Sequence, residues 1–200
     1  MRIFSSAILL IAMLPPLVSV ASAQTISSLY TSTAPKDCRV RSADNGVDDS
    51  TIRVCPGEAG LIVVVSEDDL RETVSVGRSR VLADKEPAAQ SWFGPFNSSN
   101  TTVEWRLANG KSFAIIQRWL IADNAEVDKD GQPTDKGLLV VTRLSPGAVC
   151  HVAYVDVRAN PNPNDLARQA ADEFARDFNC GKDAVKVVGE SGRAVDLAKR

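Results

Sequence analysis

The pair Asn109-Gly110 constrains the fold of this chain more than any other feature of its sequence. It lies between two β-rich runs, 101–107 and 112–121, and Asn-Gly between such runs is the strongest short-range pattern for a type I′ hairpin. With these two residues as the turn, Trp105 is predicted to face Ala114. The predicted core face of the hairpin consists of Val103, Trp105, Leu107, Ala114, Ile116 and Leu120. The second run is apolar on both faces, which predicts a central strand covered on both sides.

The chain after this hairpin predicts two more strands and a helix. Residues 137–144 and 149–157 are β-rich, so four antiparallel strands are expected to form a meander. A helix is expected to begin near Asn164 and to run to about Asn179, with its buried stripe repeating every four residues. The buried stripe consists of Leu166, Ala170, Phe174 and Phe178. The solvent-facing side consists of Arg168, Asp172 and Arg176. The predicted class is therefore α+β, an antiparallel sheet meander with one long C-terminal amphipathic helix packed on it.

The first half of the chain is less regular. Residues 24–50 read as loop with a short strand at best. Three β-rich runs follow, and 83–91 is the most linker-like stretch, with a short helical turn as the alternative there. These runs are 51–54, 61–65 and 73–76. The prediction is a single exported domain over 24–200, with a β-rich N-terminal part at 24–90 and the meander plus helix at 91–200.

Residues 1–23 have the pattern of a cleavable export signal. Arg2 precedes an apolar run from Ala7 to Leu14, and Ala21-Ser22-Ala23 forms an Ala-x-Ala cleavage site. The apolar run is much shorter than the roughly 20 residues of a membrane span. The sequence predicts a periplasmic or secreted protein that begins at Gln24 and has no membrane span after cleavage.

The charge of the chain argues against one class of partner. Its formal net charge is −2, and loss of Arg2 with the signal makes the remainder one unit more negative. Binding to phosphate backbones depends on a basic surface, so nucleic acid is not expected as a partner.

Four cysteines, Cys38, Cys55, Cys150 and Cys180, suggest two disulfides in an exported chain. Three pairings are possible. Cys38–Cys55 with Cys150–Cys180 is favoured because each bond then joins neighbours within one half of the chain.

Three short segments carry a resemblance: the run Ser66–Thr73, the run Thr102–Arg106 and the pair Cys180-Gly181. They are similar to segments of exported alphaproteobacterial proteins of unassigned function. The resemblance implies a bacterial periplasmic protein, and it implies no activity and no site residues.

Metal binding and histidine-dependent catalysis find little support. Asp128, Asp130 and Asp135 lack the rest of a calcium-loop pattern and are expected to lie in an ordinary loop. His151 is the only histidine, and it lies in a β-rich run without a nucleophile motif. It is therefore expected to be structural. No cofactor, metal site or catalytic residue is predicted.

Two further groups of residues are candidates for function. The carboxylates Glu67–Asp69 and Glu104 are the residues that a glycosidase-like reaction would use. Trp92, Phe93 and Phe96 surround Gly94-Pro95 and form either a contact surface for a glycan or protein partner or a loop pinned to the core.

The sequence therefore predicts a non-enzymatic periplasmic module that binds or inhibits an envelope protein or glycan. The alternative is a small cell-wall hydrolase that uses these carboxylates.

Overall fold

The structure is a computed structural model that describes residues 24–42 and 50–199. The expected signal peptide, residues 1–23, and its cleavage site lie outside these residues. The described strands are β1 (Ile26–Ser32), β2 (Arg39–Ser42), β3 (Thr51–Pro56), β4 (Ile62–Asp68), β5 (Arg71–Gly77), β6 (Asn97–Ala108), β7 (Lys111–Val127), β8 (Pro133–Arg143), β9 (His151–Asp156) and β10 (Lys186–Val187). The helices are α1 (Arg80–Ala83), α2 (Pro163–Phe174) and α3 (Arg193–Ala198), with short 3₁₀ turns η1 (Pro35–Asp37) and η2 (Pro87–Gln90).

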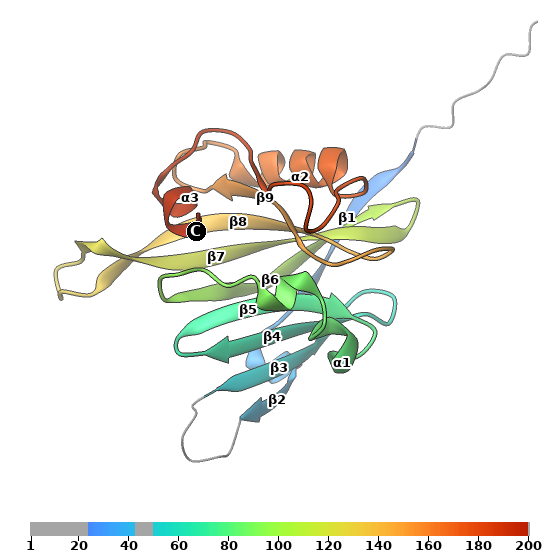
Figure 1. Cartoon of the computed structure of the whole chain (residues 1–200), viewed down its shortest axis with the longest axis horizontal. Coiled ribbons are helices and arrows are strands. Elements are labelled where there is room, and N and C mark those ends of the chain that lie inside the picture. Colours follow the sequence, from blue (N-terminus) through green and yellow to red (C-terminus); the bar gives the residue numbers. More distant parts are fainter. Residues whose placement is uncertain (1–23, 43–49, 200) are drawn as a thin grey trace, which may run out of the picture.

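The strands form two sheets that pack face to face (Figure 1). The larger sheet has the order β1-β6-β7-β8-β9-β10, and the smaller one has the order β2-β3-β4-β5. In Figure 1 the helix α2 covers the face of the larger sheet that points away from the smaller one. Strand β7 is thus covered on both sides, as the sequence predicts for 112–121.

The predicted α+β class is wrong. The described part of the chain is mostly β, with 47% of the described residues in strands and 17% in helices. The predicted meander is present as β6-β7-β8-β9, but it is only part of one of two sheets. The helix α2 has 12 residues and ends at Phe174 instead of near Asn179, so a long C-terminal helix is absent from the described residues.

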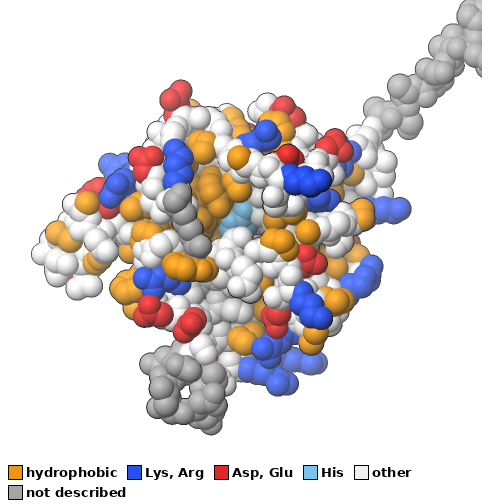
Figure 2. All heavy atoms as spheres, in the orientation of Figure 1, with side chains coloured by type: hydrophobic (Ala, Val, Ile, Leu, Met, Phe, Trp, Pro, Cys, Tyr) orange, Lys and Arg blue, Asp and Glu red, His pale blue; other side chains and the backbone are white. Residues whose placement is uncertain are grey.

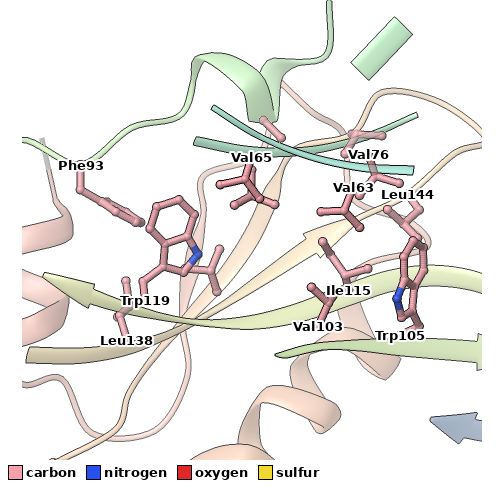
Figure 3. Close-up of a cluster of buried hydrophobic side chains, with 14 of the residues drawn as sticks. Val63, Val65, Val76, Phe93, Val103, Trp105, Ile115, Trp119, Leu138 and Leu144 are labelled. Carbon is pink, nitrogen blue, oxygen red and sulfur yellow. The ribbon is translucent and has the colours of Figure 1, made fainter. Parts of the chain in front are cut away.

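The main core lies between the two sheets (Figure 3). Trp105 and Trp119 of the larger sheet are 0% and 1% exposed, and Val63 and Val65 of β4 approach them from the smaller sheet (Figure 3). Burial of large apolar side chains from both sheets is the main force that holds such layers together.

The Asn109-Gly110 turn forms as predicted, but the register of the hairpin differs. Both residues have positive φ, 50° and 76°, as a type I′ turn requires. Trp105 pairs with Ile115 and not with Ala114, because the register shifts between Arg106 and Leu107. Such a β-bulge moves every later side chain of one strand to the opposite face.

The bulge also corrects the predicted core face. Val103, Trp105 and Leu107 share the inter-sheet core with residues of β7 that the sequence places on the other face. These residues are Ile115, Trp119 and Ile121. Ala114 and Ile116 instead face α2.

The second core lies between the larger sheet and α2. The helix presents small side chains to the sheet: Ala167, Ala170 and Ala171 are 0% exposed, while Phe174 is only partly buried at its edge. Asp172, predicted on the solvent side, instead reaches the sheet, where its carboxylate accepts hydrogen bonds from Arg106 at 2.9 and 2.5 Å.

Two N-terminal predictions also need correction, although the short helical turn considered for 83–91 is present as η2. Residues 24–42 contain two strands, and β1 pairs with β6 along its whole length. The expected linker 83–91 holds the end of α1 and the turn η2, and Ala83 and Ala88 are both fully buried there. Both segments are fixed by partners distant in sequence, which local patterns do not reveal.

All four cysteines are paired, Cys38 with Cys55 and Cys150 with Cys180. These are the pairs that the sequence favours. Two disulfides are typical of a protein outside the reducing cytoplasm. In the part of the chain that the structure describes, no helix is long and apolar enough to span a membrane.

Candidate functional site

The candidate site is built on the tip of the β4–β5 hairpin. Asp68 pairs with Arg71, so Asp69 and Leu70 form the turn, with φ of 48° and 58°. A leucine with positive φ is uncommon, and it costs about 1–2 kcal/mol that glycine would avoid. Its side chain is 61% exposed, so no core packing offsets that cost. Backbone strain of this kind at a surface is characteristic of functional sites.

Four polar side chains project from one face of this hairpin, the face away from the larger sheet. Ser66 pairs with Thr73 across the strands, and two positions further along the hairpin Asp68 pairs with Arg71. Successive residues of a strand point to opposite faces, so these alternate positions share a face. Together with Asp69, Ala89, Trp92 and Gly94 they line an open groove of about 710 Å³.

The aromatic loop 92–96 forms one wall of this groove. Trp92 is 45% exposed and Phe96 is 42% exposed. The guanidinium carbon of Arg71 lies 5.9 Å from the centroid of the Trp92 ring and 4.9 Å from that of Phe96. Both distances are within the range of cation–π attraction. The two rings are therefore exposed and held in place.

Hydrogen bonds fasten the aromatic loop to the hairpin. Arg71 donates from Nε to the carbonyl of Gly94 at 2.8 Å, and it also pairs with the carboxylate of Asp69. The buried amide of Asn97 donates to the carbonyl of Pro95 at 2.9 Å, and its oxygen accepts the backbone N–H of Glu72 at 3.2 Å. Arg71 is a positioning residue, because its Nε and Nη1 donate to Gly94 and Asp69 of the protein itself.

Phe93 does not belong to the contact surface predicted from sequence. It is 2% exposed and packs edge-to-face on Trp119, with ring centroids 5.1 Å apart. The predicted surface is thus divided: Trp92 and Phe96 face solvent, whereas Phe93 anchors the loop in the core.

His151 lies beneath the same loop. In the pairing of β9 with β8, the register shifts between Val141 and Thr142 of β8. The resulting β-bulge in β9 places His151 and Tyr154 on the same side of the sheet, although they are three residues apart. Nδ1 of His151 lies 3.0 Å from the hydroxyl of Tyr154. Burial lowers the pKa of His151 from 6.5 to about 4, so the imidazole is neutral at physiological pH.

Of the carboxylates considered for hydrolysis, only Asp68 and Asp69 line the groove, and Asp69 is paired with Arg71. Glu104 is 8% exposed and accepts hydrogen bonds from Arg168 at 2.7 Å and from Ser28 at 2.5 Å. This contact raises the pKa of Arg168. Glu67 accepts from the hydroxyl of Thr51 at 3.2 Å, on the opposite face of β4 from Asp68.

The aspartates near the β7–β8 turn also have structural contacts. Asp128 accepts the backbone N–H groups of Asp130 and Gln132 at 2.8 and 3.0 Å, which closes the turn. Within residues 24–42 and 50–199, no three acidic, histidine or cysteine side chains are grouped as metal ligands would be.

The sequence reveals only part of this site. It singles out Trp92 and Phe96, but it gives no indication that Arg71 lies against both rings. The four residues Asp68-Asp69-Leu70-Arg71 lack the Asn or Gly that marks a type I′ turn. The groove residues Ser66 and Asp68 on β4, and Arg71 and Thr73 on β5, are each two positions apart. This spacing becomes informative only when the register of the hairpin is known.

Comparisons with protein-family models, with curated proteins and with solved structures yield no match. The geometry of the groove is therefore the basis for assigning a function.

Proposed function

We propose that this protein is an exported, non-enzymatic binding module that holds a glycan of the cell envelope in the groove beside Trp92. The observation that carries the proposal is the exposed Trp92 ring at the wall of a groove that also contains hydroxyl and carboxylate groups. A sugar ring has an apolar C–H face and a rim of hydroxyls. An aromatic ring can pack against the apolar C–H face. Ser, Thr and Asp side chains can form hydrogen bonds with the hydroxyl groups.

The charge of the groove limits the kinds of glycan that it can bind. The guanidinium of Arg71 is paired with Asp69, so the exposed carboxylate of Asp68 leaves the groove with an excess negative charge. Anionic polysaccharides are repelled by such a groove, whereas neutral or amino sugars are accepted. The backbone of peptidoglycan is built of amino sugars, most of them N-acetylated and neutral.

The groove is also rigid, which favours binding. Arg71 and Asn97 hold the aromatic loop through the contacts described above, so few side chains lose freedom when a ligand binds. The hydrolase alternative has less support, because Glu104 is paired with Arg168 and Glu67 lies on the other face of β4. In the groove itself, Asp69 is paired with Arg71, which leaves Asp68 without a second free carboxylate beside it.

Co-sedimentation with purified peptidoglycan tests this function. We expect the wild-type protein to pellet with the polymer and Trp92→Ala to bind at least ten-fold more weakly, since aromatic anchors contribute about 1–3 kcal/mol. Tyr30→Ala is the matched control, because Tyr30 is 56% exposed on another part of the surface. Neutral N-acetylglucosamine oligomers should compete, and alginate should not.

Three results contradict the proposal: no pelleting of the wild type, equal pelleting of Trp92→Ala, or equal loss in Tyr30→Ala. Release of soluble sugar fragments from the polymer supports the hydrolase instead. Capture of a specific envelope protein, lost in Trp92→Ala, supports a protein partner instead.

We further propose that residues 1–23 are removed on export to the periplasm and that the mature chain begins at Gln24. The two disulfides support a compartment outside the reducing cytoplasm. N-terminal sequencing of the exported protein should start at Gln24, and thiol titration of the denatured, unreduced protein should find no free thiol. A periplasmic form that begins at Met1 contradicts the cleavage.

A further inference from the structure

A second depression lies on the other side of Trp92, and its chemistry differs from that of the glycan groove. Its volume is about 360 Å³, within the size range of small-molecule sites. One wall is aromatic and the other aliphatic. The aromatic wall consists of Trp92, Phe93 and Tyr154, and the aliphatic wall of Val185, Val187 and Ala198. We call this depression the slot. Figure 2 shows hydrophobic side chains around a hollow in which the single histidine is visible.

The aliphatic wall exposes valines that the sheet directs into the slot. Strand β10 pairs in parallel with β9 at the edge of the larger sheet. Its side chains alternate: Lys186 lies over the ring of Phe174 at 4.8 Å, and Val188 packs in the core beneath α2. Val185 and Val187 therefore point the other way, and they remain 37% and 38% exposed.

Both walls are fixed before any ligand arrives. The aromatic wall rests on the buried ring of Phe93 and on the hydrogen bond between His151 and Tyr154. The aliphatic wall includes the end of α3, whose N-terminal Ala194 donates its backbone N–H to Asp156 at 2.9 Å. Arg193 also binds Asp123 with two hydrogen bonds of 2.7 Å. A preformed apolar cavity binds apolar groups without a large ordering cost.

The charge at the rim defines one end of the ligand. Among the described residues that line the slot, Lys199 is the only charged one. Its ammonium lies 3.8 Å from Asp196, and both side chains are more than half exposed. Exposed pairs of this kind are weak, so the ammonium can exchange Asp196 for an anionic group of a ligand.

We propose that the slot binds a small amphipathic anion, with an aliphatic chain between the two walls and a carboxylate at Lys199. The proposal does not depend on glycan binding. Val185 is outside the groove, so the slot can be altered while the groove stays intact.

Calorimetric titration with octanoate, and with octan-1-ol as the uncharged probe, tests the site. We expect saturable one-to-one binding of octanoate that weakens at least ten-fold in Val185→Glu. Val40→Glu is the matched control, because Val40 is 48% exposed on β2, outside the slot. The circular dichroism spectrum and the melting temperature of Val185→Glu should equal those of the wild type, which shows that this variant is folded.

Lys199→Ala tests the charged end. It should weaken octanoate about two- to five-fold, the effect of one exposed ion pair, and leave octan-1-ol unchanged. The slot proposal fails if neither probe binds saturably or if Val185→Glu binds octanoate as well as the wild type does. Equal binding of octanoate by Lys199→Ala and the wild type overturns the assignment of the carboxylate.

Discussion

At the scale of single residues, His151 shows how burial turns a titratable group into a structural one. Phe93 stacks near it with a centroid distance of 6.0 Å, and Trp119 and Tyr154 complete an aromatic cluster around it. The sequence predicts a structural histidine from the missing catalytic partners. It does not predict the cluster, because the β-bulge in β9 brings His151 and Tyr154 to one face.

The lowered pKa of His151 gives stability a defined pH dependence. The folded protein keeps the imidazole neutral down to about pH 4, whereas the unfolded chain takes up a proton near pH 6.5. The unfolded state therefore binds more protons between these values, and stability falls as the pH is lowered through this window. From pH 7 to pH 5 the loss due to this residue should be about 2 kcal/mol.

Urea unfolding of the wild type and of His151→Gln at both pH values measures this loss. The wild type should lose about 2 kcal/mol more than the variant over this range. Equal pH dependence of the two proteins would mean that His151 is already accessible to protons in the fold.

At the scale of secondary-structure elements, α2 is attached to the sheet by a charged contact that its sequence does not suggest. Arg106 of β6 has a side chain that is 10% exposed, and Asp172 of α2 binds it with two hydrogen bonds. Removal of Asp172 leaves this nearly buried charge without its closest counter-ion, since the other acidic partner, Glu104, lies 3.9 Å away.

Asp172→Ala should therefore lower the free energy of unfolding by about 1–3 kcal/mol, the contribution of hydrogen bonds to a charged group. Asp165→Ala is the control on the same helix. The Asp165 side chain is 71% exposed and pairs with Arg168 at 3.0 Å, so its loss should cost well under about 1 kcal/mol. Chemical denaturation of both variants compares them, and equal costs would show that Arg106 does not depend on Asp172.

The elements differ in how far local sequence predicts them. Strands β3, β4 and β5 and the β6–β7 turn are predicted because their patterns are local. Strand β1 is missed because its sequence is polar and its pairing partners in β6 lie 70 to 82 residues away. The helix α2 ends early because the chain leaves its axis. The carbonyl oxygen of Phe178 accepts a hydrogen bond from Arg143, and Cys180 forms a disulfide with Cys150. Tertiary contacts of this kind override helical spacing.

At the scale of the whole molecule, a close contact between the two layers lies where Gly57, which directly follows β3, meets Trp105 of β6. A Cβ atom at Gly57 would lie 2.7 Å from the ring of Trp105 and 2.8 Å from the carbonyl oxygen of Leu61. Both contacts are shorter than van der Waals separation, and Trp105 is fully buried. A methyl group here therefore requires the buried ring of Trp105 or the backbone at Leu61 to shift.

Gly57→Ala should lower the free energy of unfolding by about 1–3 kcal/mol, as overpacking of a core does. Gly94→Ala is the control, because an added Cβ there meets no atom within 4 Å. The two melting temperatures, measured side by side, should differ by several degrees. If both variants melt like the wild type, the sheets are not in close contact at Trp105.

The two disulfides have a consequence for how the molecule is made. Each bond joins cysteines that are consecutive along the chain, with separations of 17 and 30 residues. A chain is synthesised from its N-terminus, so Cys55 meets Cys38 before Cys150 has emerged. Correct pairing then follows from the order of synthesis, and a simple oxidant is sufficient without exchange between wrong partners.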